Sequence, residues 1–262
     1  MRDFDYKKSL GQNFLKDQNI INKISDSINP SKEDLIIEIG PGAGALTKEL
    51  VKKNCDVICF EIDTRLEEKL NKIKDSNSNF KVVFHDFLKV DTSKYIDTSK
   101  YKNIYYVGNL PYYITTAIIN KIVNESNPYE ITIMVQKEVA ERFAAKPNTR
   151  EYGSISVFLQ YNFDIETVCI VNKNCFEPIP KVDSAVIKLK TTNKYQKTVK
   201  NEVKLYKLIK DSFTYKRKNL RNNLKNYNQA KIEEILKKYD KDLTARAESL
   251  RIEEFIDISN NI

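Results

Sequence analysis

The sequence predicts an α/β protein, in which helices cover both faces of a largely parallel sheet and a small all-helical domain follows. Three observations support this prediction. Short apolar runs alternate with helical stretches over the first two thirds of the chain, which is typical of a parallel sheet. A glycine-rich segment follows the first of the strand-like runs, and the pattern becomes purely helical after Thr191. We therefore expect one domain over residues 1–192 and a second over residues 193–262.

The first predicted helix covers residues 17–28, and Asp17 can cap its N-terminus. Its isoleucines fall on one face: Ile20, Ile21, Ile24 and Ile28. Apolar runs predict strands over Leu35–Ile39, Asp56–Phe60, Phe80–Phe84, Asn103–Val107 and Glu130–Val135. Helical spacing predicts helices over Ala45–Lys53, Thr64–Lys74, Ile114–Asn124 and Lys137–Ala145.

Two later runs rich in β-branched and aromatic residues, Ser154–Phe163 and Ser184–Lys190, could extend the sheet. The second domain is predicted to contain only helices, over Val199–Thr214, Lys216–Asn226, Ala230–Tyr239 and Ile252–Ile258. A polar insert at residues 91–102 contains Thr-Ser-Lys-Tyr twice, and we assign it no function.

The composition is that of a globular protein, with 41% hydrophobic and 31% charged residues. No apolar run approaches the eighteen or so residues that a membrane span needs. The first residues contain no apolar signal segment. We expect a cytoplasmic, monomeric protein with no membrane partner.

The cysteines and histidine argue against two kinds of catalytic site. The four cysteines form no Cys-x-x-Cys pair, and His85 is the only histidine. Zinc ligation is therefore not expected, nor is any other metal site, and buried free thiols fit better. A hydrolase triad has no support either, because the chain lacks a nucleophile elbow.

The net charge of +8 is unevenly distributed. Residues 186–262 carry 19 Lys or Arg and 10 Asp or Glu, whereas residues 1–185 carry 25 and 26. Such a surplus suits a solvated helical surface or a polyanionic partner. Aromatic residues interleaved with the basic ones favour the partner: Tyr195, Tyr206, Phe213, Tyr215 and Tyr227.

A nucleotide site is predicted at the carboxyl ends of the first three strands. Gly40, Gly42 and Gly44 follow the first strand and permit a tight turn close to a ligand. Glu61 ends the second strand, where its carboxylate can accept both hydroxyls of a ribose. Asp86 follows the third strand and can accept a hydrogen bond from an adenine amino group. Taken singly, the glycines could form an ordinary strand–helix turn, and either carboxylate could lie on the surface.

The fourth strand is followed by an unusual run, residues 108–113, which reads Gly-Asn-Leu-Pro-Tyr-Tyr. Asn109 offers a side-chain carbonyl acceptor. Pro111 restricts Leu110 to extended geometry, which gives the Leu110 carbonyl a fixed direction. Tyr112 supplies a ring face on which an unstacked base can lie. The run could also be a strand end with packing tyrosines, but its place downstream of the glycine loop favours a clamp for the amino group of a nucleobase.

The spacing of Gly40, Gly42 and Ala45 also fits a dinucleotide-binding loop, so a nicotinamide-dependent oxidoreductase is an alternative. Two features argue against it. An acidic residue after the third strand suits a ligand with one adenosine, and the Asn-Leu-Pro-Tyr run places an amino-group clamp at the expected reactive centre. We therefore infer S-adenosylmethionine as the cofactor and a Rossmann-like sheet of the class I methyltransferase type.

Several further segments match one family in its own order. These are Lys8–Leu15, the glycine loop, Gly108–Tyr112, Val135–Arg142, Phe176–Ala185, Lys216–Leu224 and Arg246–Leu250. On these segments the chain resembles the ribosomal RNA adenine dimethyltransferases over nearly its whole length, and most closely those acting on small-subunit RNA. The resemblance implies cofactor contacts at six positions: Asn13, Leu15, Gly40, Glu61, Asp86 and Asn109.

The resemblance also implies the substrate and partner. These are two adjacent adenines in a hairpin loop near the 3′ end of 16S ribosomal RNA, each dimethylated at N6 within an immature 30S subunit. Tyr112 and Phe14 are expected to sandwich the extruded base, and Phe176 could stack there too, although Phe14 and Phe176 could equally be packing residues. Lys146, Arg150 and the basic helices, which include Lys216, Arg217 and Arg221, are expected to hold the RNA backbone.

The chemistry expected at the clamp is a direct methyl transfer. The N6 amine of adenine is a poor nucleophile, because its lone pair is delocalised into the ring. We expect Asn109 Oδ1 and the Leu110 carbonyl to accept its two hydrogens and to favour a pyramidal nitrogen aimed at the methyl group. No general base is needed, since the methylated amine is strongly acidic.

Two alternatives stay open at this point. One is a resistance methyltransferase that acts on an adenine of 23S RNA with the same chemistry. The other is a mainly structural assembly factor of the 30S subunit, for which methylation is a release signal. The long basic C-terminal domain favours the small-subunit enzyme over the first alternative.

Overall fold

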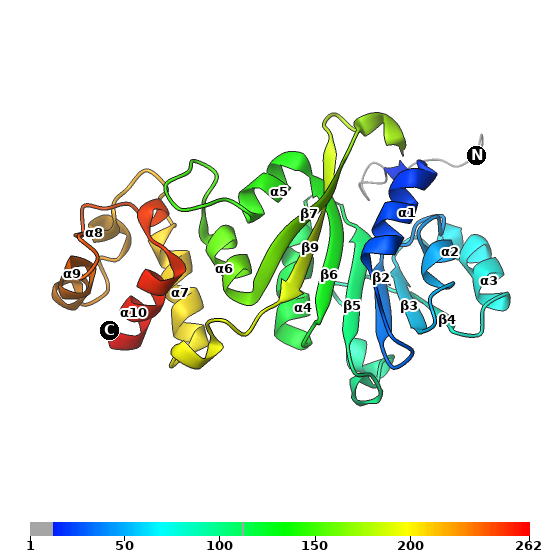
Figure 1. Cartoon of the computed structure of the whole chain (residues 1–262), viewed down its shortest axis with the longest axis horizontal. Helices are drawn as coiled ribbons and strands as arrows, with labels where there is room; N and C mark the ends of the chain where they lie inside the picture. The colour runs from blue at the N-terminus through cyan, green and yellow to red at the C-terminus, as the bar shows by residue number, and fades with distance from the viewer. Residues whose placement is uncertain (1–12, 112) are drawn as a thin grey trace. The chain divides into compact units, whose positions relative to one another are not determined.

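The computed structural model describes residues 13–111 and 113–262, and within them lies a seven-stranded sheet of order β4-β3-β2-β5-β6-β9-β7 (Figure 1). Five of the strands run parallel, namely β2 (Leu35–Ile39), β3 (Asp56–Glu61), β4 (Phe80–Phe84), β5 (Ile104–Asn109) and β6 (Glu130–Gln136). Each matches the apolar run that predicted it to within two residues at either end. Strand β9 (Ser184–Thr191), also predicted, pairs antiparallel with β6, so the sheet is mixed.

Helices cover both faces of this sheet, as the alternating pattern predicted. The helices up to residue 143 are α1 (Gln18–Ser27), α2 (Thr47–Leu50), α3 (Glu67–Asp75), α4 (Thr115–Glu125) and α5 (Lys137–Phe143). Asp17 caps α1 as predicted, because its side chain accepts hydrogen bonds from Asn19 N and Ile20 N. Helix α2 is shorter than predicted. Asn79 Nδ2 binds the carbonyls of Val51 and Cys55, at 3.1 and 2.8 Å, and these contacts hold the following residues in turns.

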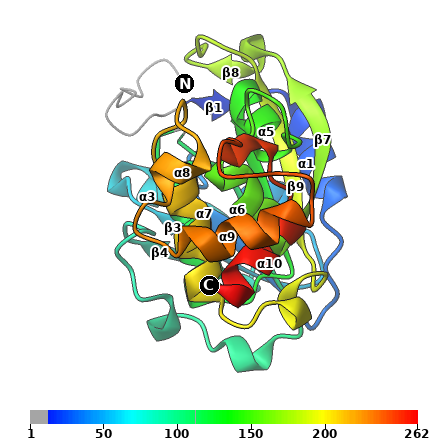
Figure 2. The same cartoon turned by 90° about the vertical axis from the view of Figure 1, so that its left-hand side faces the viewer.

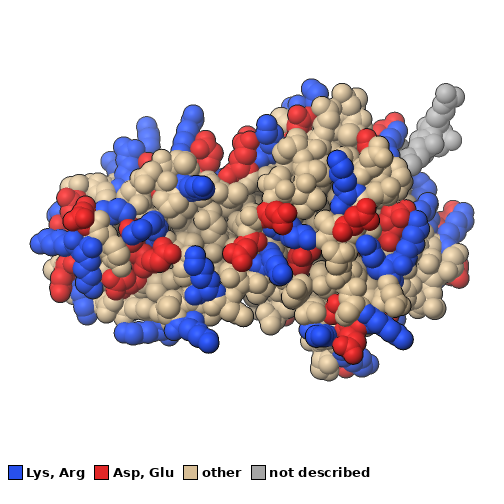
Figure 3. All heavy atoms as spheres, viewed as in Figure 1, with Lys and Arg blue, Asp and Glu red and all other residues tan. Residues whose placement is uncertain are grey.

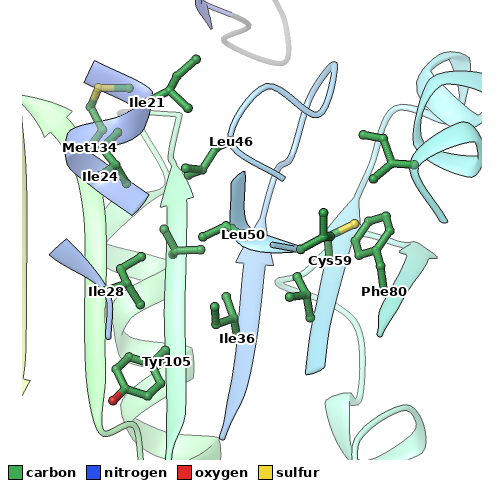
Figure 4. Close-up of a cluster of buried hydrophobic side chains, with 14 of the residues drawn as sticks. Ile21, Ile24, Ile28, Ile36, Leu46, Leu50, Cys59, Phe80, Tyr105 and Met134 are labelled. Carbon is green, nitrogen blue, oxygen red and sulfur yellow. The ribbon is translucent and has the colours of Figure 1, made fainter. Parts of the chain in front are cut away.

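The core lies between the central strands and the helices α1, α2 and α3 (Figure 4). All five residues of β2 are buried, which is why this strand reads as an almost continuous apolar run. Ile36 of β2 and Cys59 of β3 lie in one cluster with Leu50 of α2 and the apolar face of α1. Helix α4 lies behind the strands in Figure 1, and three of its isoleucines are buried, Ile118, Ile119 and Ile122.

Residues 154–162 form a helix, although a strand was predicted over residues 154–163. Helix α6 covers Ser154–Asn162, and strand β7 follows directly over Phe163–Val171. Val157 and Tyr161, four positions apart, are fully buried on one face of α6, and Gly153 N donates to Ser156 Oγ at its start. Packing of this face against other helices decides the conformation, although the residue types favour a strand.

Two compact units make up the chain, and their division differs from the predicted one at 192/193. One unit contains residues 1–140 and 166–190, the other residues 141–165 and 191–262. The second unit includes α6, whose Tyr152 loop and buried face share a core with Leu205 and Leu208. Its other helices are α7 (Glu202–Ser212), α8 (Leu220–Asn223), α9 (Gln229–Lys237) and α10 (Ile252–Asn261) (Figure 2).

Helix α8 is much shorter than the predicted helix at residues 216–226. Asn219 caps it by accepting a hydrogen bond from Asn222 N at 3.2 Å. The three residues Lys216, Arg217 and Lys218 therefore lie in a turn before the helix. The Asn223 side chain fixes that turn by accepting from Tyr215 N at 3.0 Å.

The polar insert folds as two copies of one turn, at Thr92–Lys94 and Thr98–Lys100. Asp91 and Asp97 open the two turns, and each accepts hydrogen bonds from the N–H and the hydroxyl of a serine two residues later. The repeated sequence therefore gives a repeated Asp-capped turn.

Candidate active site

A cleft of about 150 Å³ opens at the carboxyl ends of β2, β3 and β5, within the first unit. The glycine loop after β2 forms one side, and residues 108–111 form another. Strand β1 (Phe14–Leu15) and the preceding Asn13 also line the cleft, together with residues of α1 and β6. This is the edge at which open parallel sheets bind ligands, and it is where the sequence predicted a nucleotide site.

The glycine loop has the left-handed backbone that the three glycines predicted. The φ angles of Gly40, Gly42 and Gly44 are +69°, +58° and +79°, a region that favours glycine. Gly42 is further constrained by space, because a Cβ atom there would lie 2.6 Å from the Phe14 ring. The Phe14 side chain therefore packs directly against the loop and forms a wall of the cleft.

Glu61 lies in the cleft with its carboxylate held by two loops. Oε2 accepts from Gly42 N at 3.0 Å, and Oε1 accepts from Asp63 N at 2.8 Å. Burial raises the pKa of Glu61, and these backbone hydrogen bonds oppose that rise. Asp63 is itself fixed by a bidentate pair with Arg65, with Nε–Oδ1 and Nη2–Oδ2 distances of 2.8 and 2.6 Å. The carboxylate is thus oriented before any ligand binds.

Sequence reasoning assigned no role to a second carboxyl group in the cleft, that of Glu38. Its side chain is 2% exposed and accepts a hydrogen bond from Thr47 Oγ1 at 2.7 Å. Burial raises the pKa of Glu38 to about 8, and the nearby Glu61 acts in the same direction. Glu38 could have been noticed in the sequence, because an acidic residue inside an otherwise apolar strand indicates a buried carboxyl group with a specific partner.

Asp86 follows β4 at the same edge of the sheet, but it is not among the residues that line the cleft. Its Oδ1 accepts from Leu88 N at 2.9 Å, and its Oδ2 lies 3.7 Å from Lys89 Nζ. The position at a strand end agrees with the prediction, while the expected contact with an adenine stays a prediction.

Asn109 is the last residue of β5 and lines the cleft. Its Nδ2 donates to the backbone carbonyl of Asn13 at 2.9 Å, which leaves Oδ1 as the acceptor end of the amide. Gly108 permits close strand packing here, because a Cβ atom would lie 2.5 Å from the Ile39 carbonyl oxygen. Leu110 and Pro111 also line the cleft, and Tyr112 lies outside the described residues.

Phe176 is buried and does not line the cleft, so the structure gives it the packing role and not the base-stacking role. It is 3% exposed and belongs to the core of the first unit. It forms strand β8 (Phe176–Glu177), which pairs antiparallel with β1. In the register of this pair, Leu15 lies opposite Phe176.

The predicted RNA-binding side chains are exposed on the helical unit: Lys146, Arg150, Lys216, Arg217 and Arg221. Lys216 Nζ donates to the Arg150 carbonyl, which brings two segments of the group together. Basic and acidic side chains are interspersed on the face shown in Figure 3. Most of the interleaved aromatic residues pack on the helical core, and Tyr215 is the exception at 63% exposure. Among these aromatic residues, Tyr215 therefore has the ring that is most open to a partner, and the contact with RNA stays a prediction.

The Rossmann-like sheet, the glycine loop with Glu61 across from it, and the Asn-Leu-Pro corner define a methyltransferase of class I architecture. The chain matches the family model for ribosomal RNA adenine dimethylases over residues 3–262. It belongs to that family, and it is an enzyme that dimethylates adenines of ribosomal RNA.

Named relatives agree with this assignment. Ribosomal RNA small subunit methyltransferase A of Bacillus pumilus is 45% identical over 98% of this chain and 91% of its own. The protein of the same name from Clostridium botulinum is 41% identical, over 99% and 95%.

Two crystal structures resemble nearly the whole chain. The 23S rRNA methyltransferase ErmE is 26% identical with a TM-score of 0.73, over 94% of this chain and 98% of its own. A dimethyladenosine transferase from Plasmodium falciparum shares the fold, with a TM-score of 0.79 at 24% identity over 94% and 95%.

Within residues 13–111 and 113–262, no three His, Cys, Asp or Glu side chains gather as a possible metal site. No helix in the same ranges has both the length and the apolar character needed to cross a bilayer.

Proposed function

We propose that this enzyme uses S-adenosylmethionine to dimethylate the N6 amino groups of two adjacent adenosines in a hairpin loop near the 3′ end of 16S ribosomal RNA. We propose that it acts in the cytoplasm, on an assembling 30S subunit. Support comes from relatives at 41–45% identity whose names specify the small subunit. The observation that carries the proposal is the position of Asn109, at a strand end inside the cleft.

The residues of the cleft fit S-adenosylmethionine. The left-handed glycines bring backbone close to a ligand, and the Glu61 carboxylate keeps lone pairs for ribose hydroxyls beyond those used by Gly42 N and Asp63 N. Ile62 follows Glu61, lines the cleft and is 52% exposed, so it offers an apolar surface to an adenine. When bound, the cofactor supplies an electrophilic methyl group on a sulfonium. Asn13, Leu15 and Asp86 are the further contacts we propose.

The amine of the target adenine is held by two acceptors. We assign one hydrogen to Asn109 Oδ1 and the other to the Leu110 carbonyl. Accepting both hydrogens draws the nitrogen lone pair out of conjugation and directs it into the cleft. Positioning then does most of the catalytic work. After transfer the nitrogen carries a positive charge and is acidic, so one of these acceptors or water can take its proton.

The base that presents this amine needs a wall on each face. Tyr112 supplies one ring, as the family resemblance implies. Phe14 forms a wall of the cleft against Gly42, and we assign its ring contacts with both the cofactor and the base. Phe176 is left out of this role because it is buried in the core.

The helical unit binds the phosphate backbone in this proposal. Residues 191–262 carry 17 Lys or Arg and 10 Asp or Glu, and the basic side chains named above are exposed. Phosphate contacts of this kind position the RNA and carry no sequence information. Recognition of the immature subunit is therefore a separate property from base selection in the cleft.

Methyl transfer assays test the proposal. The purified enzyme is given S-adenosylmethionine with either undermethylated 30S particles or 23S RNA, and N6,N6-dimethyladenosine is measured by mass spectrometry. We expect product on the 30S particles alone. Product on 23S RNA alone would favour the alternative of a resistance methyltransferase. The 23S rRNA methyltransferase ErmE has a similar fold, so the fold does not decide between the two.

A second experiment separates the enzyme from a mainly structural assembly factor. The Asn109→Ala protein should lose turnover by a factor of about 100 or more, as when a positioned hydrogen-bond acceptor or donor is removed from an active site. Its affinity for 30S particles should stay unchanged. If cells that carry only this variant accumulate trapped subunits and grow worse than cells without the protein, release by methylation is part of its task.

A further inference from the structure

We infer that the backbone carbonyl of Asn13 positions the catalytic amide of Asn109. Residues 13–16, called the N-terminal segment below, therefore set the direction of Asn109 Oδ1, the acceptor that holds the target amine. This inference rests on the proposed function of Asn109. It gives the N-terminal segment a role in the chemical step that is additional to cofactor contact.

The hydrogen bond itself joins residues 96 positions apart, with Asn109 Nδ2 at 2.9 Å from the Asn13 carbonyl oxygen. A side-chain amide has one donor end and one acceptor end, so fixing the donor fixes the acceptor as well. The terminal torsion of asparagine is otherwise broad and roughly two-fold. An amide turned by half a rotation would present N–H groups to the amine, and two donors would then face each other.

Asn13 directly precedes a short two-stranded ribbon, β1 with β8, which fixes the chain that follows the Asn13 carbonyl. Phe14 lies opposite Glu177, and Lys16 N donates to the Cys175 carbonyl at 2.8 Å. Lys16 and Glu177 also form an ion pair across the ribbon. The buried side chain of Phe176 anchors the ribbon to the core of the first unit. The ribbon therefore links the segment that contacts the Asn109 amide to residues 175–177.

The two methyl transfers should depend on this contact to different extents. In the first transfer the amine has two hydrogens, so the Leu110 carbonyl still holds it if the Asn109 amide turns. In the second transfer only one hydrogen remains, and the direction of Asn109 Oδ1 decides whether the lone pair faces the cleft. A loosened amide should therefore slow the second transfer more than the first, and monomethylated adenine should accumulate.

Replacing Phe14 by its α-hydroxy acid tests the inference, because this converts the Asn13 carbonyl into an ester carbonyl, a weaker acceptor, and keeps the phenyl ring. The same replacement at Glu177 is the matched control, since it removes an N–H from the other strand of the same ribbon and weakens the Phe176 carbonyl instead, and neither residue lines the cleft. The readout is the ratio of monomethylated to dimethylated adenosine at equal turnover, together with the cofactor Kd from calorimetry.

We expect the ratio to rise about three- to tenfold in the Phe14 ester, the range expected for weakening one hydrogen bond. The Glu177 ester should keep both the wild-type ratio and the wild-type cofactor Kd. A wild-type ratio in the Phe14 ester, or an equal rise in both esters, would overturn the inference.

Charge variants test the ribbon by a second route. Lys16→Glu should place two carboxylates across the ribbon and raise the ratio, and the exchange Lys16→Glu with Glu177→Lys should restore it. No restoration would contradict the role of the ribbon. The ratio is measured on whichever ribosomal RNA the wild-type enzyme methylates, so failure of the 16S assignment shows as the wrong substrate and leaves this comparison intact.

Discussion

The backbone N–H of Gly42 donates to the Glu61 carboxylate at 3.0 Å, which ties the loop after β2 to the end of β3. The second carboxylate oxygen is held by Asp63 N at 2.8 Å. Two loops that each supply part of the cleft therefore share one carboxyl group. Its orientation is set by the protein, so a ligand that uses it meets a prepared acceptor.

Replacing Glu61 by glutamine should weaken cofactor binding much more than it slows the chemical step. One end of the glutamine amide is a donor, and that end must face either Gly42 N or Asp63 N, which are donors too. We expect the Kd for S-adenosylmethionine to rise about tenfold or more, as for loss of a charge-assisted hydrogen bond, with kcat within a few-fold of wild type. Calorimetry measures the first quantity and single-turnover kinetics the second.

The matched control is Glu68→Gln, because Glu68 is a fully exposed carboxylate paired with Lys72 on α3. Its Kd should equal that of the wild type. If Glu61→Gln binds the cofactor normally and loses only kcat, the ribose contact is wrong.

Much of the site could be predicted because its parts lie at strand ends. Buried strands read as apolar runs, and the residues that follow them, such as Glu61 and Asn109, must then meet at one edge of the sheet. The contact of Asn109 with Asn13 could not be predicted in this way, since no local pattern specifies a hydrogen bond across 96 positions.

The wrong prediction at residues 154–163 has a similar cause. Val157 and Tyr161 are residue types that favour strands, but they are also four positions apart and fill the helical core. The local sequence fits both the helical and the strand spacing of apolar residues. The helices that decide between the two, such as α7, lie far along the chain. The division into units was missed for the same reason, because α6 packs on helices that follow residue 191.

Gly108→Ala should lower both stability and activity. The added Cβ atom would lie 2.5 Å from the Ile39 carbonyl oxygen, so β5 and β2 must move apart directly beside Asn109. Overpacking of a tight core site costs about 1–3 kcal/mol, and a displaced catalytic group costs rate as well. Urea unfolding and turnover measure the two effects.

Gly153→Ala is the control for this prediction. The nearest atom to a Cβ atom at Gly153 is 4.0 Å away, and the residue has an ordinary extended φ of −157°. We expect its stability to change by less than about 1 kcal/mol and its activity to stay at the wild-type level. Equal losses in the two variants would mean that contact with Ile39 is not the cause.

Glu38 should make the folded protein less stable as pH rises. Burial raises the pKa of Glu38 to about 8, from 4.5, so between these values the folded chain keeps a proton that the unfolded chain has released. The free energy of unfolding must then fall with rising pH across this window, by a few kcal/mol in total. This contribution is present in full below about pH 4.5 and is lost above about pH 8.

Glu38→Gln removes that proton exchange and keeps an acceptor for Thr47 Oγ1. Urea unfolding at pH 5, 6.5 and 8 should show the variant gaining stability relative to wild type at each step. The raised pKa of Glu61 also lowers stability with rising pH in both proteins, so the test is the difference between the two pH curves. Two parallel pH curves would show that Glu38 is already ionised in the folded state.

Charge reversals on the helical unit should weaken RNA binding and reduce its dependence on salt. Each Lys or Arg that neutralises a phosphate releases counterions on binding, so its loss lowers the slope of log K against log salt by up to about one. We expect the triple variant Lys216→Glu, Arg217→Glu, Arg221→Glu to lose two to three of these contacts. The measurement is the affinity for 30S particles at salt concentrations from roughly 50 to 200 mM.

The control reverses three exposed lysines of the first unit, Lys48, Lys52 and Lys74, and so changes the net charge equally. Because local phosphate contacts and not overall charge set the slope, only the first variant should change it. The same flattening in both would mean that the basic residues of the helical unit act only through net charge.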